Sequence, residues 1–239
     1  MNQVPPQGPA PPAQPTPRPA PVTRPPILRT EGLKLADGDG LVYGPLDLTV
    51  GPGQGALVVT PDLEILRRLM KCCLAFERPE AGRLSWWPGA RTRAGESGWA
   101  GYDFFRQIGY VDRQSQLLHR WSLQDHFRFF QLYTQRDDDP DATRPLLSQL
   151  GLDGYENTPT EDLPEPLRRL ALCALVLNQR PRLMLLERPI QFLDRDFDLV
   201  WDLVLDQSRT NNLAVVVFDR TRTPYAGDAF LRPVAFTSA

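Results

Sequence analysis

The chain of 239 residues lacks several features by which proteins are commonly sorted. Its formal net charge is only −2, so the excess of basic residues that a nucleic acid partner would require is absent. No stretch of eighteen apolar residues occurs, and residues 1–26 contain no apolar signal-peptide core. The three cysteines, Cys72, Cys73 and Cys173, are too few for a disulfide framework. We expect reduced, buried thiols in a cytosolic protein.

Proline is distributed unevenly along the chain. Residues 1–26 hold 11 of the 25 prolines and no aspartate or glutamate. Such a segment cannot bury a core, and we predict a disordered tail with polyproline character. It is either a solvated tail or a tether that docks on a partner.

From residue 27 the pattern becomes that of a globular domain in which strands and helices alternate. Short apolar runs at 183–186 and 214–218 are typical of strands buried on both faces. Ser122 and Asp125 have the spacing of a capping box at a helix start. The pattern predicts an α/β fold with a mostly parallel sheet flanked by helices. We predict strands at 27–35, 41–50, 56–59, 83–87, 107–111, 183–186 and 214–218, a short final strand, helices at 61–76, 122–133, 141–150, 166–177 and 197–208, and a loop at 88–104.

Four short segments are the runs AFERPEAG at 75–82, IGYV at 108–111, residues 117–123, and PRLMLLERPIQFLD at 181–194. Together they resemble the nucleotide-binding subunit of ATP-binding-cassette (ABC) transporters. The last run is similar to that family's PxLLLLDEPxxxLD and the first to its GLxxPxxG. IGYV resembles the strand that leads into the family's Q-loop, and residues 117–123 resemble the entry to its helical subdomain. The resemblance covers residues 27–236 and implies a P-loop NTPase-like (RecA-like) core with an ABC-type helical subdomain at about 115–175.

Laid on the family's pattern without gaps, the phosphate-binding loop G-x-x-x-x-G-K-[ST] keeps its length but not its residues. Thr60 and Ile65 stand at glycine positions, Leu66 at the lysine position and Arg67 at the Ser/Thr position. The loop needs glycines for close backbone approach and lysine as a phosphate-binding cation.

The same residues have the pattern of an ordinary capped helix. Thr60 is a suitable N-cap and Pro61 a suitable first helical residue. Asp62 and Glu64 would then place carboxylates in the first turn, where they stabilise the helix and repel a triphosphate.

The family's remaining functional positions are changed as well. Glu187 stands for the Walker B aspartate and Arg188 for the catalytic glutamate, and a guanidinium cannot act as a general base. Both have an alternative role as partners in a salt bridge. The other changed positions are Arg113 for the Q-loop glutamine, Asp219 for the switch histidine, and Pro164 and Glu165 within the signature motif.

These changes lead to the hypothesis of a catalytically inactive subunit that binds neither ATP nor Mg²⁺. Its role would be structural or regulatory, peripheral on the cytoplasmic face of a membrane. The resemblance implies a permease or a second ATPase subunit as partner, in a homo- or heterodimer. Candidate permease-docking residues, which are equally suited to the core of the helical subdomain, are Tyr110, Leu117, Leu118, Trp121 and Phe127.

Two alternatives remain. One is an atypical ATP-binding subunit with weak or displaced ATPase activity, using Arg67 or Arg68, Glu187, and Asp162 or Asp219. The other is a soluble scaffold whose proline-rich tail binds a partner. His119 and His126 lack Cys or Glu partners at ligand spacing, so we predict surface histidines rather than a metal site.

Overall fold

The computed structural model describes residues 25–86, 90–93, 105–134 and 140–238. Most of the predicted proline-rich tail, 1–24, lies outside this part of the chain. The predicted domain limits, 27–236 with a helical subdomain at about 115–175, stay a prediction. Among the described helices, none combines the length and apolar character needed to cross a membrane.

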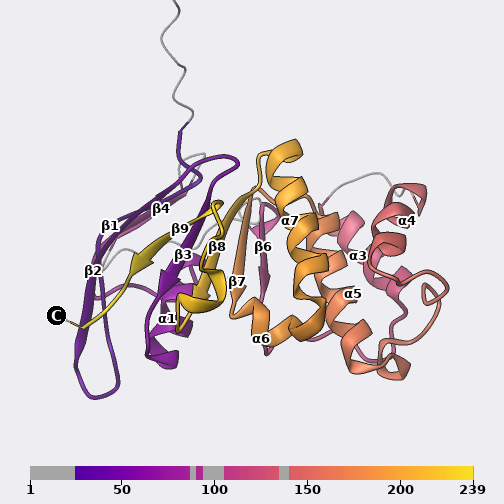
Figure 1. Cartoon of the computed structure of the whole chain (residues 1–239), viewed down its shortest axis with the longest axis horizontal. Helices are drawn as coiled ribbons and strands as arrows, with labels where there is room; N and C mark the ends of the chain where they lie inside the picture. The colour runs from indigo at the N-terminus through magenta and orange to yellow at the C-terminus, as the bar shows by residue number, and fades with distance from the viewer. Residues whose placement is uncertain (1–24, 87–89, 94–104, 135–139, 239) are drawn as a thin grey trace, which may run out of the picture.

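Two β-sheets organise the described residues (Figure 1). The first is antiparallel, in the order β2-β1-β4-β5. The second is parallel throughout, in the order β6-β7-β8-β3-β9. Their bounds are β1 Leu28–Ala36, β2 Val42–Val50, β3 Gly55–Val59, β4 Ala81–Trp86, β5 Ala90–Arg93, β6 Ile108–Val111, β7 Leu183–Glu187, β8 Ala214–Asp219 and β9 Leu231–Ala235.

Helices cover both faces of the parallel sheet. The α1 helix lies on the side of the antiparallel sheet, whereas α5, α6 and α7 lie on the opposite side, with α3 and α4 beyond α5 (Figure 1). The predicted α/β fold, with a parallel sheet flanked by helices, is confirmed. The helices are α1 Leu63–Cys73, α3 Leu123–Thr134, α4 Pro140–Gln149, α5 Glu165–Asn178, α6 Pro189–Leu193 and α7 Phe197–Asn211, with short 3-10 turns at Thr160–Asp162, Asp194–Asp196 and Thr223–Tyr225.

The parallel strands bury alternate side chains in two separate cores. In β8, Val215 and Val217 belong to the core beneath α5 and α7, whereas Val216 and Phe218 belong to the core shared with α1. Because both faces are covered, these strands are continuously apolar, as the runs at 183–186 and 214–218 predicted. The three cysteines are free thiols buried in these cores, as expected.

Close packing of α5 on the sheet depends on Gly109 in β6. A Cβ built on Gly109 would lie 2.4 Å from Cγ1 of Val176, closer than side chains approach one another. The capping box that begins α3 is also formed: the Ser122 N–H donates to Oδ2 of Asp125 at 3.0 Å, and the Asp125 N–H donates to Oγ of Ser122 at 3.1 Å.

Two local predictions are wrong. The segment predicted as a loop at 88–104 contains strand β5 at Ala90–Arg93, while 94–104 lies outside the described residues. The phosphate-binding loop does not keep its length, because only Thr60, Pro61 and Asp62 separate β3 from α1. The N-cap is Asp62 rather than Thr60, and its Oδ1 accepts the Ile65 N–H at 3.0 Å.

Candidate functional site

The carboxyl ends of three neighbouring strands meet at one edge of the parallel sheet. Thr60 follows β3, Glu187 ends β7 and Asp219 ends β8, in the strand order β7-β8-β3. Ligands commonly bind outside this edge of open parallel sheets. We call the residues gathered here the strand-end site: Thr60, Arg67, Glu187, Arg188, Asp219 and Arg220.

An ion pair links α1 to β7 within the strand-end site. Nε of Arg67 lies 3.4 Å from Oε1 of Glu187. The Glu187 side chain is 1% exposed and that of Arg67 is 37% exposed. Burial raises the pKa of Glu187 above its ordinary value, and the nearby Arg67 guanidinium opposes that shift. The Arg67 guanidinium therefore pairs with the carboxylate of Glu187, the residue predicted to stand at the Walker B position.

Two buried polar atoms of the strand-end site have no hydrogen-bond partner among the residues that the structure describes. They are Oγ1 of Thr60, a fully buried residue, and Nε of Arg188. Arg188 has left-handed backbone angles, φ 48° and ψ 53°. Arg220 reaches across the connection to α1, where its Nε donates to the Pro61 carbonyl at 2.8 Å. Unpaired hydrogen-bond donors and arginine side chains at one edge of the sheet are suited to an anionic ligand that accepts hydrogen bonds.

Asp219 has a structural partner of its own. Its Oδ2 accepts the Tyr225 hydroxyl at 2.8 Å, and its carbonyl accepts the Thr60 N–H at 3.1 Å. Burial, together with the Asp219 charge, raises the pKa of Tyr225. At the predicted switch position, Asp219 thus anchors the turn after β8.

Two residues of the predicted phosphate-binding loop do not reach the strand-end site. Ile65 and Leu66 are both 0% exposed and lie in the core that α1 shares with the two sheets. Because α1 already begins at Leu63, the residue at the lysine position, Leu66, lies on the side of the helix that faces the core. In its place, the next residue, Arg67, faces Glu187.

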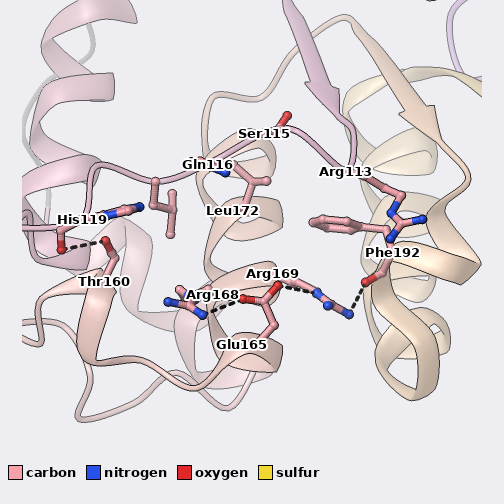
Figure 2. A pocket seen from close by; sticks show the side chains of 11 residues that line it. Arg113, Ser115, Gln116, His119, Thr160, Glu165, Arg168, Arg169, Leu172 and Phe192 are labelled. Carbon is pink, nitrogen blue, oxygen red and sulfur yellow. Dashed lines mark hydrogen bonds and ion pairs between the residues drawn. The ribbon is translucent and has the colours of Figure 1, made fainter. Parts of the chain in front are cut away.

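The positions predicted as Q-loop and signature motif meet at a second place, a cavity of about 240 Å³ that we call the Glu165 pocket (Figure 2). Pro164 is the N-cap residue of α5, and Glu165 is its first residue. The pocket is lined by Arg113, Ser115, Gln116, Leu117, His119, Thr160, Glu165, Arg168, Arg169, Leu172 and Phe192.

A third hollow, of about 450 Å³ and mostly apolar, lies between β6 and the helices α3 and α5, and we call it the aromatic groove. Several of its side chains are exposed, including Phe76 at 59% and Phe129 at 47%. Its lining residues are Leu74, Phe76, Phe105, Ile108, Gly109, Tyr110, Ser115, Gln116, Phe129, Phe130, Tyr133, Leu172, Val176 and Gln179.

The five candidate docking residues are separated in the structure. Tyr110 lines the aromatic groove, whereas Leu117 lines the Glu165 pocket. Leu118 is 54% exposed, Trp121 packs edge-on against His126 and Phe129, and Phe127 is buried. Sequence reasoning assigned no docking role to Phe76, Phe105 or Tyr133. The exposed aromatic at the end of the first helix, Phe76, was the available signal.

The two histidines differ, and the prediction of surface exposure is wrong for His126. It is 3% exposed, its Nδ1 donates to the Ser122 carbonyl at 2.8 Å, and its Nε2 accepts the Leu118 N–H at 2.9 Å. Burial lowers the pKa of His126, although its bond to Ser122 and the Asp125 charge oppose that shift. His119 is exposed. No three His, Cys, Asp or Glu side chains within the described ranges are grouped as metal ligands.

No family model matches this sequence. Several curated proteins are nevertheless similar to it over most of its length. It is 27% identical over 192 residues to the "Cytochrome c biogenesis ATP-binding export protein CcmA" of Cupriavidus necator, covering 80% of this chain and 82% of that protein. It is 28% identical over 179 residues to the protein of the same name from Methylococcus capsulatus, covering 74% and 83%.

Solved structures share its fold. A dimeric bacterial ABC transporter cassette aligns with a TM-score of 0.70 and 13% identity, over 88% of this chain and 94% of that chain. At this identity the likeness concerns the fold, and it agrees with the parallel sheet and helical layers described above.

These relatives overturn two predictions, namely that the chain is a catalytically inactive subunit and that it takes no ATP or Mg²⁺. Each of six matching relatives carries the name of an ATP-binding export protein. Both predictions rested on the replacement of residues at the family's motif positions. Phosphate binding requires cations and hydrogen-bond donors, however, and arginines at the strand-end site supply both.

Sequence relatives and solved structures therefore agree: the chain is similar in sequence to ATP-binding export proteins and in fold to the cassettes of ATP-binding-cassette (ABC) transporters.

Proposed function

We propose that this chain is the ATP-binding subunit of an ABC-type export complex, peripheral on the cytoplasmic face of a membrane. The observation that carries the proposal is its similarity to six ATP-binding export proteins over 70–82% of the chain. Its partners would be a membrane permease and a second cassette, either another copy or a different subunit.

The strand-end site supports nucleotide phosphates on arginine side chains rather than on a glycine-rich loop. The loop itself does not fit the family's mode of binding, because the Asp62 carboxylate already accepts the Ile65 N–H at the start of α1. Arg67, Arg188 and Arg220 instead supply guanidinium groups at this edge of the sheet: Arg67 pairs with Glu187, Arg188 follows β7, and Arg220 donates to the Pro61 carbonyl. Guanidinium groups bind phosphate oxygens through paired N–H donors.

ATP binding to the full chain tests this part of the proposal. Calorimetric titration is expected to show saturable binding. Arg67→Ala should weaken binding about tenfold, as expected for loss of one charge-assisted contact. Arg209→Ala provides a matched control, because Arg209 is an exposed arginine in the last turn of α7. Absence of binding at millimolar ATP, or equal weakening by both substitutions, would reject the arginine site.

The aromatic groove supports contact with the permease. It is apolar, it holds exposed aromatic side chains, and it lies between the parallel sheet and α3. Exposed aromatic clusters of this kind are common at the energetic centres of protein interfaces. We expect an apolar segment of the permease to bind there, with Tyr110 and Phe129 at its edge.

Recruitment to membranes tests the groove. Phe129→Asp should abolish co-sedimentation of the full chain with inverted membrane vesicles from its own cells. Leu199→Asp is the control, because Leu199 is 41% exposed on α7 and does not line the groove. Equal recruitment of the two variants would contradict the docking role.

A further inference from the structure

The Glu165 pocket combines three guanidinium groups with a single carboxylate. Arg113 comes from the segment after β6, and Arg168 and Arg169 come from the first turn of α5 (Figure 2). Among the described residues that line the pocket, Glu165 is the only acidic one. The cavity therefore carries a net positive charge that its own residues leave uncompensated.

Glu165 holds two of the guanidinium groups in place without using all their donors. Its Oε2 accepts from Nε and Nη2 of Arg168 at 3.1 and 2.7 Å, and its Oε1 accepts from Nε of Arg169 at 3.0 Å. Nη1 of Arg169 donates to the Phe192 carbonyl at 2.9 Å. A guanidinium has five N–H donors, so both groups keep N–H donors for a ligand.

Arg113 is the uncommitted cation of the pocket. It is exposed, and within the described part of the chain it makes no hydrogen bond or ion pair of its own. Figure 2 shows it beside Phe192, on the side of the cavity opposite Arg168. An anion in the cavity would thus meet Arg113 on one side and the α5 arginines on the other.

The size and the apolar part of the lining limit the ligand. At about 240 Å³, the cavity is smaller than the roughly 300–1,000 Å³ of pockets that take drug-sized molecules, so a whole nucleotide exceeds it. Leu117, Leu172 and Phe192 supply apolar surface beside the cations. Neutral polar groups, Ser115, Gln116 and Thr160, complete the lining.

We propose that the Glu165 pocket binds a small phosphate monoester, with the phosphate between Arg113 and the α5 arginines and an apolar group against Leu172 and Phe192. The proposal does not depend on ATP binding at the strand-end site. It assigns a separate ligand site to positions that the family pattern gives to the Q-loop and signature motif.

Titration of the full chain with phenyl phosphate tests the site at physiological ionic strength, where adventitious surface charge is largely screened. Phenyl phosphate should bind more tightly than inorganic phosphate, and phenol should not bind. Arg113→Ala should weaken phenyl phosphate binding about tenfold, through loss of one charge-assisted contact. Because Arg113 is exposed and unpaired within the described residues, the variant should fold normally.

Three further variants separate the possible results. Glu165→Gln removes the like charge and should tighten binding, whereas Arg209→Ala should leave it unchanged. Equal weakening by Arg113→Ala and Arg209→Ala would overturn the proposal in favour of diffuse surface attraction. Loss of binding in Arg67→Ala would also overturn it, because the ligand would then occupy the strand-end site.

Discussion

The starts of helices α1 and α5 each carry a carboxylate where the family pattern places a phosphate-binding motif, yet the two carboxylates act differently. Asp62 is the N-cap of α1 and accepts a backbone N–H. Glu165 accepts no backbone N–H of its helix, and α5 has no side-chain cap. It binds the side chains of Arg168 and Arg169 instead.

This difference shows that a carboxylate near a helix start can cap the backbone N–H groups in one helix and leave them uncapped in another. At α1 the carboxylate satisfies an N–H group that a phosphate would otherwise bind. At α5 it orients arginines toward a cavity, and partial burial works against its charge while hydrogen bonds from Arg168 and Arg169 lower its pKa.

The largest effect is expected from restoring the missing lysine at α1. Leu66→Lys should lower the free energy of unfolding by more than about 3 kcal/mol, because it replaces a fully buried leucine with an ammonium group in an apolar core. Chemical denaturation measures the change. Glu64→Lys, on the exposed side of the same turn, should cost less than about 1 kcal/mol. Comparable losses in both variants would contradict the placement of Leu66.

The stability of the region around α5 should depend on pH through His126. This residue accepts the Leu118 N–H and so supports the segment beside the Glu165 pocket. His126→Leu leaves the Leu118 N–H without its acceptor and should cost about 1–2 kcal/mol at pH 7.5.

The sign of the pH effect follows from the lowered pKa of His126. Below about pH 6.5 the histidine is protonated in the unfolded chain but stays largely neutral in the folded protein. The free energy of unfolding of the wild type therefore decreases as the pH is lowered. The difference between wild type and His126→Leu should therefore shrink from pH 7.5 to pH 5. His119→Leu, at an exposed position, should show no such trend, and a constant difference for His126→Leu would contradict the neutral buried ring.

The smallest effect comes from removing the two carboxylates themselves. Asp62→Ala should cost about 1 kcal/mol, the usual value of an N-cap. Glu165→Ala should cost less than about 0.5 kcal/mol, because its ion pairs are solvent-exposed. Thermal unfolding of both variants at one pH compares them, and a larger loss for Glu165→Ala would reverse the assignment of the cap.

Much of the fold could be predicted from the sequence because its signals are local. Apolar runs mark β7 and β8, and the spacing of Ser122 and Asp125 marks the start of α3. The cap of α1 was misplaced by two residues, since Thr60, Pro61 and Asp62 all suit a helix start. Which of them became the cap depended on how far β3 extends before α1 packs against the sheet.

The candidate site was less predictable because it joins residues from distant parts of the chain. An alignment without gaps placed the lysine position on Leu66, but a shortened connection turns that residue into the core and Arg67 toward Glu187. Inactivity was inferred from missing letters, and the related ATP-binding proteins contradict it.

The sequence by itself determined the order of strands and helices, the apolar faces that these elements bury, and the resemblance to ABC cassettes. Apolar periodicity and motif order are properties of neighbouring residues, so they can be recognised without the tertiary structure. Only the tertiary structure decided which charged residues meet. The strand-end site needs β3, β7 and β8 side by side, and the Glu165 pocket needs the segment after β6 to lie against α5 and α6. Such meetings depend on packing between elements separated by more than a hundred residues, as with Arg67 and Glu187, and no local pattern specifies them.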